Sequence, residues 1–172
     1  MTGRQMLDDL AVRIYEEPLL HIRNAPEWPS LTNPLHLTAL LVDFDTEVAI
    51  NGILGFLENS SGAHLDKTID AFIALGAHDT AEVLQRIREV LRKHGVSHQK
   101  LRSDFKNTSQ YEITSFSKLH GASLNEFAQE VCAIADLLYS DRTSQGSPFL
   151  RLEVYLEEHA SEIQSELSRV GS

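Results

Sequence analysis

Five glutamates near the end of the sequence recur at helical spacing, namely Glu153, Glu157, Glu158, Glu162 and Glu166. Pairs four residues apart place their carboxylates on one helical face at about 6 Å of axial rise. Like charges at this spacing cost an isolated helix roughly 0.2 to 0.5 kcal/mol per pair, so the row does not serve helix stability. Such a row can bind lysines and arginines that are arranged to hold a phosphate backbone. The alternative is an ordinary solvated face of a terminal helix.

A second acidic group lies in the first third of the sequence and consists of Asp43, Asp45, Glu47 and, a few turns later, Glu58. We take both acidic groups as candidate binding residues for a basic partner. The alternative for the second group is helix capping, because Asp45 stands where a helix N-terminus is stabilised by negative charge.

A basic stretch interrupts the acidic sequence. Residues 86 to 106 hold seven basic and two acidic side chains, a net charge of +5, while the rest of the chain carries −15. Phe105 is the only aromatic residue in this stretch, and no zinc or recognition-helix signature accompanies it, so direct nucleic-acid binding is not predicted. We expect the stretch to contact the acidic surface, either within the chain or between two copies in a homodimer.

The remaining reactive side chains do not form a catalytic pattern. His94 and His98 have the spacing of two metal ligands, but Gly95 is expected to end the helix between them. Cys132 is predicted to be a small core residue. Its neighbours Glu130 and Asp136 are acidic, whereas a reactive thiol needs an electropositive setting. The serines after Asn59 lack the Gly-x-Ser-x-Gly frame of a hydrolase, and no phosphate-binding glycine loop is present. The sequence therefore predicts no enzyme, no catalytic residue, no metal site and no cofactor.

These side chains must be positioned by helices, because apolar residues recur at three and four residues through most of the chain. A first helix around residues 7 to 14 ends before Pro18, and a loop rich in proline follows. Helices are then expected at 35 to 42, from Asp45 or Thr46 to 58, at 65 to 76, and from Asp79 or Thr80 to Gly95.

The second half of the chain is less regular. Residues 96 to 121 fit a helix, a strand pair or an ordered loop. The run from Ser123 to Glu126 has the pattern of a capping box and predicts a helix to about residue 138. A polar break at 141 to 148 precedes a last helix to about residue 167. The sequence predicts one all-α compact domain of about seven helices over residues 1–172.

Composition places the protein among globular chains. A chain of 172 residues with 42% hydrophobic residues has the length of one domain, and a domain of this size buries roughly 70% of the surface of its unfolded chain. One cysteine excludes an intrachain disulfide, which fits a reducing compartment. No apolar run reaches the ~18 residues of a membrane span and no signal peptide is present, so we expect a cytoplasmic protein without a membrane contact.

A loop between two of these helices has an unusual sequence. Asn59, Ser60, Ser61 and Gly62 follow a helix that ends at Glu58, and the short polar side chains are suited to satisfy loose backbone groups while Gly62 takes the left-handed conformation. The next helix closes on Leu75, Gly76 and Ala77, and Asn51 and Gly52 lie about two turns before the first helix ends. This block resembles the bacterial DNA-mimic protein family (DNA mimic protein 19-like), which shows an Asn-Gly-Gly-Phe helix, an Asn-Ser-Ser-Gly turn and a helix closing on Ile-Gly-Ala. The resemblance covers about residues 47 to 87 and is weaker at 149 to 159.

The resemblance implies a non-enzymatic acidic protein that occupies the DNA-binding surface of a transcription factor or nucleoid protein and so regulates transcription by competitive exclusion. A net charge of −10 agrees with a basic partner and disfavours direct binding of nucleic acid, although negative charge also keeps a protein soluble. The alternative is an interaction or immunity-type protein that binds through an apolar groove with aromatic anchors such as Trp28 or Phe56, with its charge incidental. Trp28, between two prolines, also fits a lid over the core. A third alternative is a hydrolase that uses the histidines.

Overall fold

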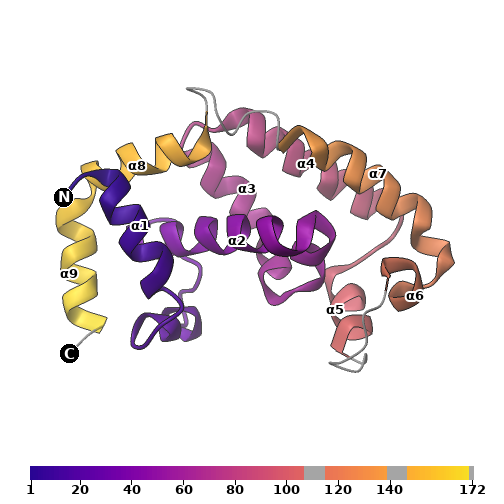
Figure 1. The fold of residues 1–172 in the computed structure, drawn as a ribbon, viewed down its shortest axis with the longest axis horizontal. Coiled ribbons are helices and arrows are strands. Elements are labelled where there is room, and N and C mark those ends of the chain that lie inside the picture. Colours follow the sequence, from indigo (N-terminus) through magenta and orange to yellow (C-terminus); the bar gives the residue numbers. More distant parts are fainter. Residues whose placement is uncertain (107–114, 139–146, 171–172) are drawn as a thin grey trace.

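The protein is described here by a computed structural model, which covers residues 1–106, 115–138 and 147–170 of the 172-residue chain. Within these ranges the chain forms helices and no strand, so the predicted all-α class is confirmed. No helix in the same ranges is both long and apolar enough to cross a membrane. The described residues hold nine α-helices (Figure 1): α1 (Gly3–Arg13), α2 (Pro34–Glu58), α3 (Leu65–Ala74), α4 (His78–Lys93), α5 (His98–Lys106), α6 (Phe116–His120), α7 (Asn125–Ala135), α8 (Pro148–Glu158) and α9 (Ala160–Val170). Short 3₁₀ turns stand between them: η1 (Leu19–Asn24), η2 (Ser60–His64), η3 (Ala122–Leu124) and η4 (Asp136–Leu138).

Helix α2 runs through the middle of the molecule, and the other helices surround it (Figure 1). Helix α3 packs on α4, α4 packs on α7, and α1 packs on α8. One end of the molecule is formed by α1, α8 and α9, and the other end by α5 and α6. In the core, the ring of Phe44 on α2 meets Phe56 and Phe72 edge to face, with centroids 5.0 and 5.4 Å away, an arrangement that stabilises aromatic pairs beyond their buried area.

Helix α2 corrects the sequence prediction of two helices separated near Asp45. It begins at Pro34, with the Asn33 side chain accepting from the backbone N–H groups of Leu35 and His36, and runs without a break through residues 43 to 46. The change of direction comes later, at Gly52, whose φ of 69° and ψ of 179° are not helical. This conformation is readily accessible to glycine and strained for other residues, so Gly52 allows a kink inside a long buried helix.

The turn after α2 differs from its predicted geometry. Gly62 does not have a positive φ, and its role is spatial instead, because a Cβ atom there would lie 2.6 Å from the carbonyl oxygen of Phe56. The Asn59 side chain binds the Glu47 carboxylate and the guanidinium of Arg102 rather than loose backbone groups. The hydroxyl of Ser61 is buried without a hydrogen-bond partner. The turn is therefore fixed by close packing and by contacts with α2 and α5.

The predicted ends of the next two helices are confirmed. Helix α3 ends at Ala74, and Gly76 follows with a φ of 71°. The N–H of Gly76 donates to the carbonyl of Ile73, and the N–H of Ala77 donates to that of Phe72, as in a glycine-terminated helix. Helix α4 ends at Lys93, just before Gly95.

The segment left undecided by the sequence contains α5 and α6 in its described parts. Residues 107–114, and most of the predicted polar break at 141 to 148, lie outside the described residues. The predicted capping box is wrong, because Ser123 lies inside η3 and the first residue before α7 is Leu124, which makes no side-chain cap. A helix does follow, as predicted, and it buries Phe127, Val131 and Ala135 in the core.

The prediction of one last helix from Pro148 to residue 167 is also wrong. His159, with φ of −108° and ψ of 17°, ends α8, and α9 begins at Ala160. The His159 ring stacks on that of Tyr155 at 4.1 Å, and its Nδ1 lies 2.9 Å from the Tyr155 carbonyl oxygen. Leu156 on α8 and Ile163 on α9 are both buried, and the two helices pack on different elements, α8 on α1 and α9 on α2.

Candidate binding surface

The break at His159 divides the first acidic group between two helices. Glu153, Glu157 and Glu158 lie on α8, while Glu162 and Glu166 lie on α9. The helical spacing of four residues therefore holds for the pairs within α8 and within α9, but not from Glu158 to Glu162. The five carboxylates do not form one straight row, although they stay at the same end of the molecule (Figure 1).

Glu157 takes part in internal packing. Its Oε1 accepts a hydrogen bond of 2.6 Å from the backbone N–H of Gly3, the first residue of α1. The first N–H groups of a helix have no partner within it and carry partial positive charge, so a carboxylate there is stabilising. The same contact requires glycine at position 3, because a Cβ atom there would lie 2.0 Å from the carbonyl oxygen of Glu153.

The other four glutamates differ in how far they are engaged. Glu166 accepts from Arg169 at 2.6 Å, and its side chain is 24% exposed. Within the described residues, Glu153, Glu158 and Glu162 make no hydrogen bond or ion pair, and the last two are exposed. Their charge still acts locally: the pKa of Tyr155 is raised first by burial and then by the nearby Glu162 carboxylate.

In the second acidic group, Asp43 forms a two-point ion pair with Arg23. The Arg23 Nε donates to Asp43 Oδ2 at 2.9 Å and Nη2 donates to Oδ1 at 2.6 Å, while Nη1 donates to the carbonyl of Ile14. The guanidinium also lies over the rings of Tyr15 and Trp28, at 5.3 and 5.9 Å from their centroids. Asp43 is thus neutralised, and it ties the loop before α2 to the middle of that helix.

Glu47 and Glu58 are engaged as well. Glu47 accepts from the amide groups of Asn51 and Asn59, at 3.0 and 2.6 Å. Glu58 Oε1 lies 2.8 Å from Nε2 of His120, and its side chain is only 12% exposed. Asp45 lies on the wall of an apolar cavity. The second group therefore joins structural elements along α2 rather than presenting one open acidic face.

Helix α1 adds acidic residues that the sequence prediction did not include. Asp8 and Asp9 are exposed on α1, which packs on α8. Residues 1–17 and 147–170 together hold nine acidic and four basic side chains, an excess of five negative charges and half of the net charge of −10. No local pattern indicated this, because the contact between α1 and α8 joins residues about 150 positions apart. We call this end, residues 1–17 and 147–170 with helices α1, α8 and α9, the acidic end.

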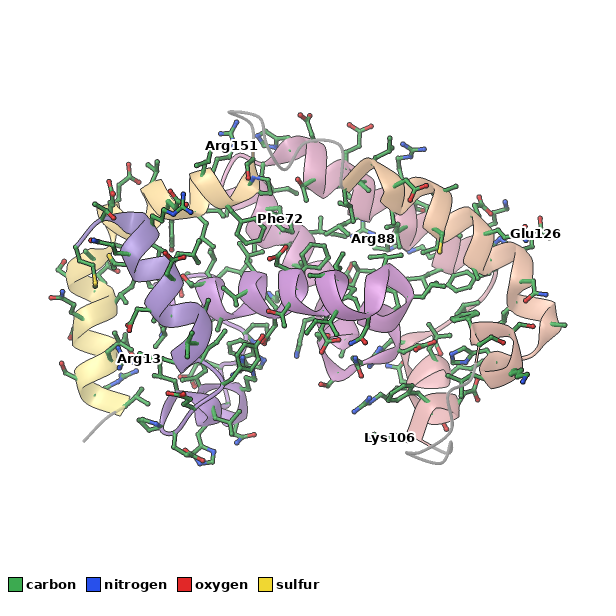
Figure 2. All side chains as sticks on the ribbon, viewed as in Figure 1. Arg13, Phe72, Arg88, Lys106, Glu126 and Arg151 are labelled. Carbon is green, nitrogen blue, oxygen red and sulfur yellow. The ribbon has the colours of Figure 1, made fainter. Side chains whose placement is uncertain are left out.

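Several side chains of the basic stretch form ion pairs within the chain, but not with the acidic surface that we expected them to contact. Arg88 binds Asp66 at 2.9 Å, Lys93 binds Glu130 at 2.8 Å, and Lys100 binds Asp104 at 2.9 Å. These acidic partners belong to α3, α5 and α7, not to the acidic end. Figure 2 shows Lys106 on α5 and Arg13 on α1 at opposite ends of the molecule. A contact between two copies stays a prediction.

The other candidate side chains lie in structural settings. His94 Nε2 is 2.9 Å from Glu130, and His98 Nδ1 is 3.0 Å from the Leu57 carbonyl oxygen. The described residues contain no group of three or more potential ligands placed to hold a metal. Cys132 is exposed, which corrects its prediction as a core residue, and burial and then Asp136 raise the pKa of its thiol.

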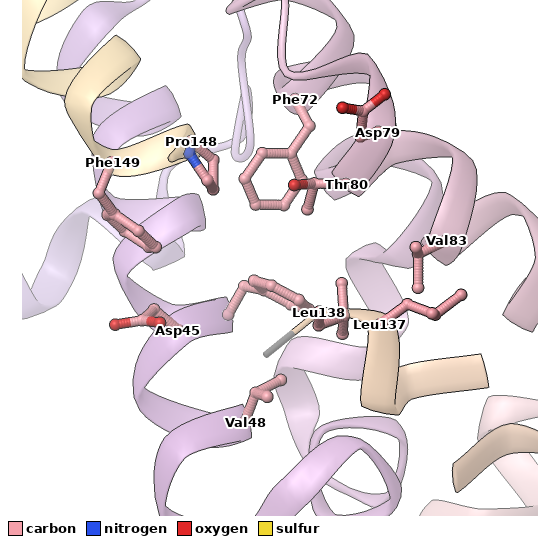
Figure 3. A pocket seen from close by; sticks show the side chains of 11 residues that line it. Asp45, Val48, Phe72, Asp79, Thr80, Val83, Leu137, Leu138, Pro148 and Phe149 are labelled. Atoms are coloured by element: carbon pink, nitrogen blue, oxygen red, sulfur yellow. The ribbon is translucent and has the colours of Figure 1, made fainter. Parts of the chain in front are cut away.

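An apolar cavity with aromatic walls lies between α2, α3, α4 and α8. Its volume is about 210 Å³, and Phe44, Phe72 and Phe149 line it. Figure 3 shows the carboxylates of Asp45 and Asp79 on opposite sides of this cavity. Of the two predicted aromatic anchors, Phe56 is 1% exposed and belongs to the core. Trp28 packs on His36 and His64, as expected of a lid.

The prediction missed His120, whose side chain is fully buried between Glu58 and Asp104. It lies in the segment where the sequence gave no clear periodicity, and its two partners are 62 and 16 residues away. No local signal in the sequence points to this contact.

Comparison with known proteins gives one match. The family model described as "DMP19-like protein" matches residues 29–159, which include α2 to α8 and exclude α1 and α9. No curated protein and no solved structure matches the chain.

Proposed function

Because the chain belongs to the DMP19-like protein family, we propose that it is a non-enzymatic acidic protein that occupies the DNA-binding surface of a transcription factor or nucleoid protein. The mechanism is competitive exclusion, in which the partner cannot hold DNA and this protein together. The family match and the charge distribution support this proposal.

The acidic end is the surface that we assign to the partner. Its main support is that Glu158 and Glu162 are exposed and make no hydrogen bond or ion pair with the described residues. Such carboxylates can bind a basic side chain without first losing an internal partner. Asp43, by contrast, would have to leave Arg23, and Glu157 would have to leave the start of α1. The proposed contact therefore centres on Glu158 and Glu162.

Electrostatics sets the expected binding behaviour. An excess of five negative charges at one end speeds encounter with a basic surface, and exposed charges are screened beyond roughly 8 Å at physiological ionic strength. Association should therefore be fast and should weaken steeply as salt is added.

The test begins with a bacterial protein fraction that binds DNA–cellulose at low salt and is released by salt. Proteins from this fraction that bind the immobilised chain are identified and purified, and each is placed on a fluorescent DNA duplex. The chain should displace the duplex in a titration at low salt. The double variant E158K/E162K should lose displacement by about tenfold or more, since close charge pairs across interfaces couple by about 1.5 kcal/mol or more.

A matched control changes the same net charge elsewhere. Asp70 on α3 and Glu82 on α4 are exposed and acidic, and D70K/E82K should retain most of the displacement. Equal loss in both variants would mean that net charge alone, and not the acidic end, decides binding. Failure of the chain to displace DNA from every captured protein would refute the proposed function.

The cavity between α2, α3, α4 and α8 favours a second candidate, an interaction protein that binds an apolar side chain of its partner. Its aromatic walls and volume of about 210 Å³ suit one such side chain. This function predicts binding that survives about 0.5 M salt, because salt does not screen apolar contacts. Substitution T80W, at the half-buried Thr80 on the cavity wall, should then abolish binding, whereas E158K/E162K should not.

A further inference from the structure

His120 joins three helices through its ring. It is the last residue of α6, and its side chain is 0% exposed. Its Nε2 lies 2.8 Å from Oε1 of Glu58, at the end of α2, and its Nδ1 lies 2.9 Å from Oδ2 of Asp104 on α5. We call these three side chains the His120 clamp.

The number of protons in the His120 clamp is constrained by its geometry. A neutral imidazole has one N–H group, and an ionised carboxylate only accepts hydrogen bonds. With both ring nitrogens facing carboxylates, a neutral ring leaves one nitrogen lone pair against one carboxylate, and water cannot replace the missing bond because the ring is buried. An imidazolium, which donates from both nitrogens, satisfies both carboxylates at once.

The other groups around the ring favour this charged arrangement. Asp104 Oδ2 also accepts from Nζ of Lys100 on α5, so the clamp and this lysine together carry two positive and two negative charges. The hydrogen bond from His120, followed by that from Lys100, lowers the pKa of Asp104. On its remaining side, the ring packs against Phe116 at 4.4 Å, and Phe116 in turn meets Phe127 of α7. Among the described residues, the ionised groups that touch the ring are Glu58 on α2 and Asp104 on α5.

We propose that the His120 imidazolium is a proton-dependent clamp that holds α5 and α6 against the end of α2, and that loss of its proton opens this end of the molecule. Deprotonation leaves one buried carboxylate facing a nitrogen lone pair. The repulsion between them is relieved when α6 moves away. Phe116 lies on α6 together with His120. Movement of α6 therefore also removes the Phe116 ring from the core. The acidic end, which lies at the other side of α2, stays in place.

The first test follows the ring and the backbone in the same pH titration of the full chain. Nitrogen chemical shifts of labelled histidine report whether one or both nitrogens of His120 are protonated, and amide hydrogen exchange reports opening of α5 and α6. Below the titration both nitrogens should be protonated. Protection factors of the α5 and α6 amides, corrected for the intrinsic pH dependence of exchange, should fall by about tenfold or more at the same midpoint as the ring loses its proton. Unchanged protection through the ring titration, or a singly protonated ring in the closed state, would overturn the proposal.

The second test removes the need for the proton. In E58Q the amide can accept from an imidazolium or donate to a neutral ring, so both protonation states are satisfied and the loss of protection should disappear. A matched control is E130Q, which changes the partly exposed pair between Glu130 and His94. In this variant α5 and α6 should open at the same pH as in the wild type. If E58Q opened at the same pH as the wild type, the clamp would not be the cause. Because the clamp is distant from the acidic end, displacement of DNA by the chain at neutral pH tests the proposed function separately.

Discussion

The backbone N–H of Gly3 donates a hydrogen bond of 2.6 Å to the side chain of Glu157, and this contact joins the first turn of α1 to α8. Glu157 appeared from the sequence to be one member of an acidic row. In the structure it accepts a hydrogen bond from a helix start, whereas Glu158, its equally exposed neighbour in sequence, makes no hydrogen bond or ion pair with the described residues. These adjacent glutamates therefore differ: Glu157 has a structural contact, and Glu158 is the one that we propose for binding.

We expect E157Q to lower the free energy of unfolding by about 1 kcal/mol, because a charge-assisted hydrogen bond at a helix N-terminus becomes a neutral one. E158Q changes an exposed carboxylate without a hydrogen bond and should remain within about 0.5 kcal/mol of the wild type. Urea denaturation of the two variants gives the comparison. Equal stability of both would show that the contact at Gly3 is not stabilising.

Substitution G3L should destabilise the fold more than E157Q does. Even the first side-chain atom would meet the Glu153 carbonyl oxygen at 2.0 Å, so α1 must move away from α8. Forcing extra atoms into a packed contact costs typically 1–3 kcal/mol, and we expect a loss of about that size. The thermal unfolding midpoint measures it, with R4L at the next, exposed position as the control. A midpoint equal to that of R4L would exclude the close approach of the two helices.

The ion pair of Arg23 with Asp43 predicts that lysine cannot replace arginine. R23K loses the two-point contact and the position of the guanidinium over Tyr15 and Trp28, and we expect a loss of about 1.5–3 kcal/mol. Trp28 is the only tryptophan, so its fluorescence reports the same site directly. R13K, at the exposed i,i+4 pair with Asp9, should change stability by less than about 0.5 kcal/mol. An unshifted Trp28 spectrum together with unchanged stability in R23K would contradict this role.

Tyr15 gives a prediction for alkaline pH. Tyr15 is 44% exposed, and desolvation of the covered part of its phenol is the main cause that raises its pKa from 10.0 to about 12. Between these two pH values the unfolded chain has lost the phenolic proton while the folded chain retains it, so the folded state binds more protons and stability must fall as pH rises. This contribution is complete below pH 10.0 and is lost as pH rises through about 12. The dependence should be weaker in Y15F, and ultraviolet titration of the folded wild type should show one tyrosine ionising later than in Y15F. Identical titration curves would refute the shift.

The parts of the fold that were predicted correctly depend on local signals. Gly76 and Gly95 end their helices where the apolar pattern stops, because glycine reaches a positive φ at little cost. The regular apolar stripe of α4 likewise decides its own buried face, with Leu84 and Ile87 both at 0% exposed.

The errors arise where contacts between distant segments override local signals. Asp45 suggested a helix start, but residues 43 to 46 continue α2, because Asp43 is held by Arg23 from an earlier loop. The kink occurs at Gly52, where the sequence pattern continues as a helix. The end of α8 at His159 has neither glycine nor proline to mark it. Apolar periodicity alone therefore did not place the breaks at Gly52 and His159.

The candidate site was predicted in part. The sequence identified Glu158 and Glu162, which are exposed at the acidic end, but it could not separate them from Glu157, whose partner lies 154 residues earlier in the chain. It also grouped Glu58 with the binding residues, although His120 holds that carboxylate inside the fold. Charge and spacing indicate which residues are acidic, whereas tertiary contacts determine which of them are available.

The division between α8 and α9 has a consequence for how the protein could change over evolution. On one continuous helix, the distances between successive carboxylates are fixed by the backbone itself. Here the separation of Glu158 from Glu162 also depends on how α9 rests against α2, where Ile163 is buried. A substitution in that apolar contact can therefore alter the spacing of the charges and so adapt the protein to a different partner without adding or removing a single carboxylate.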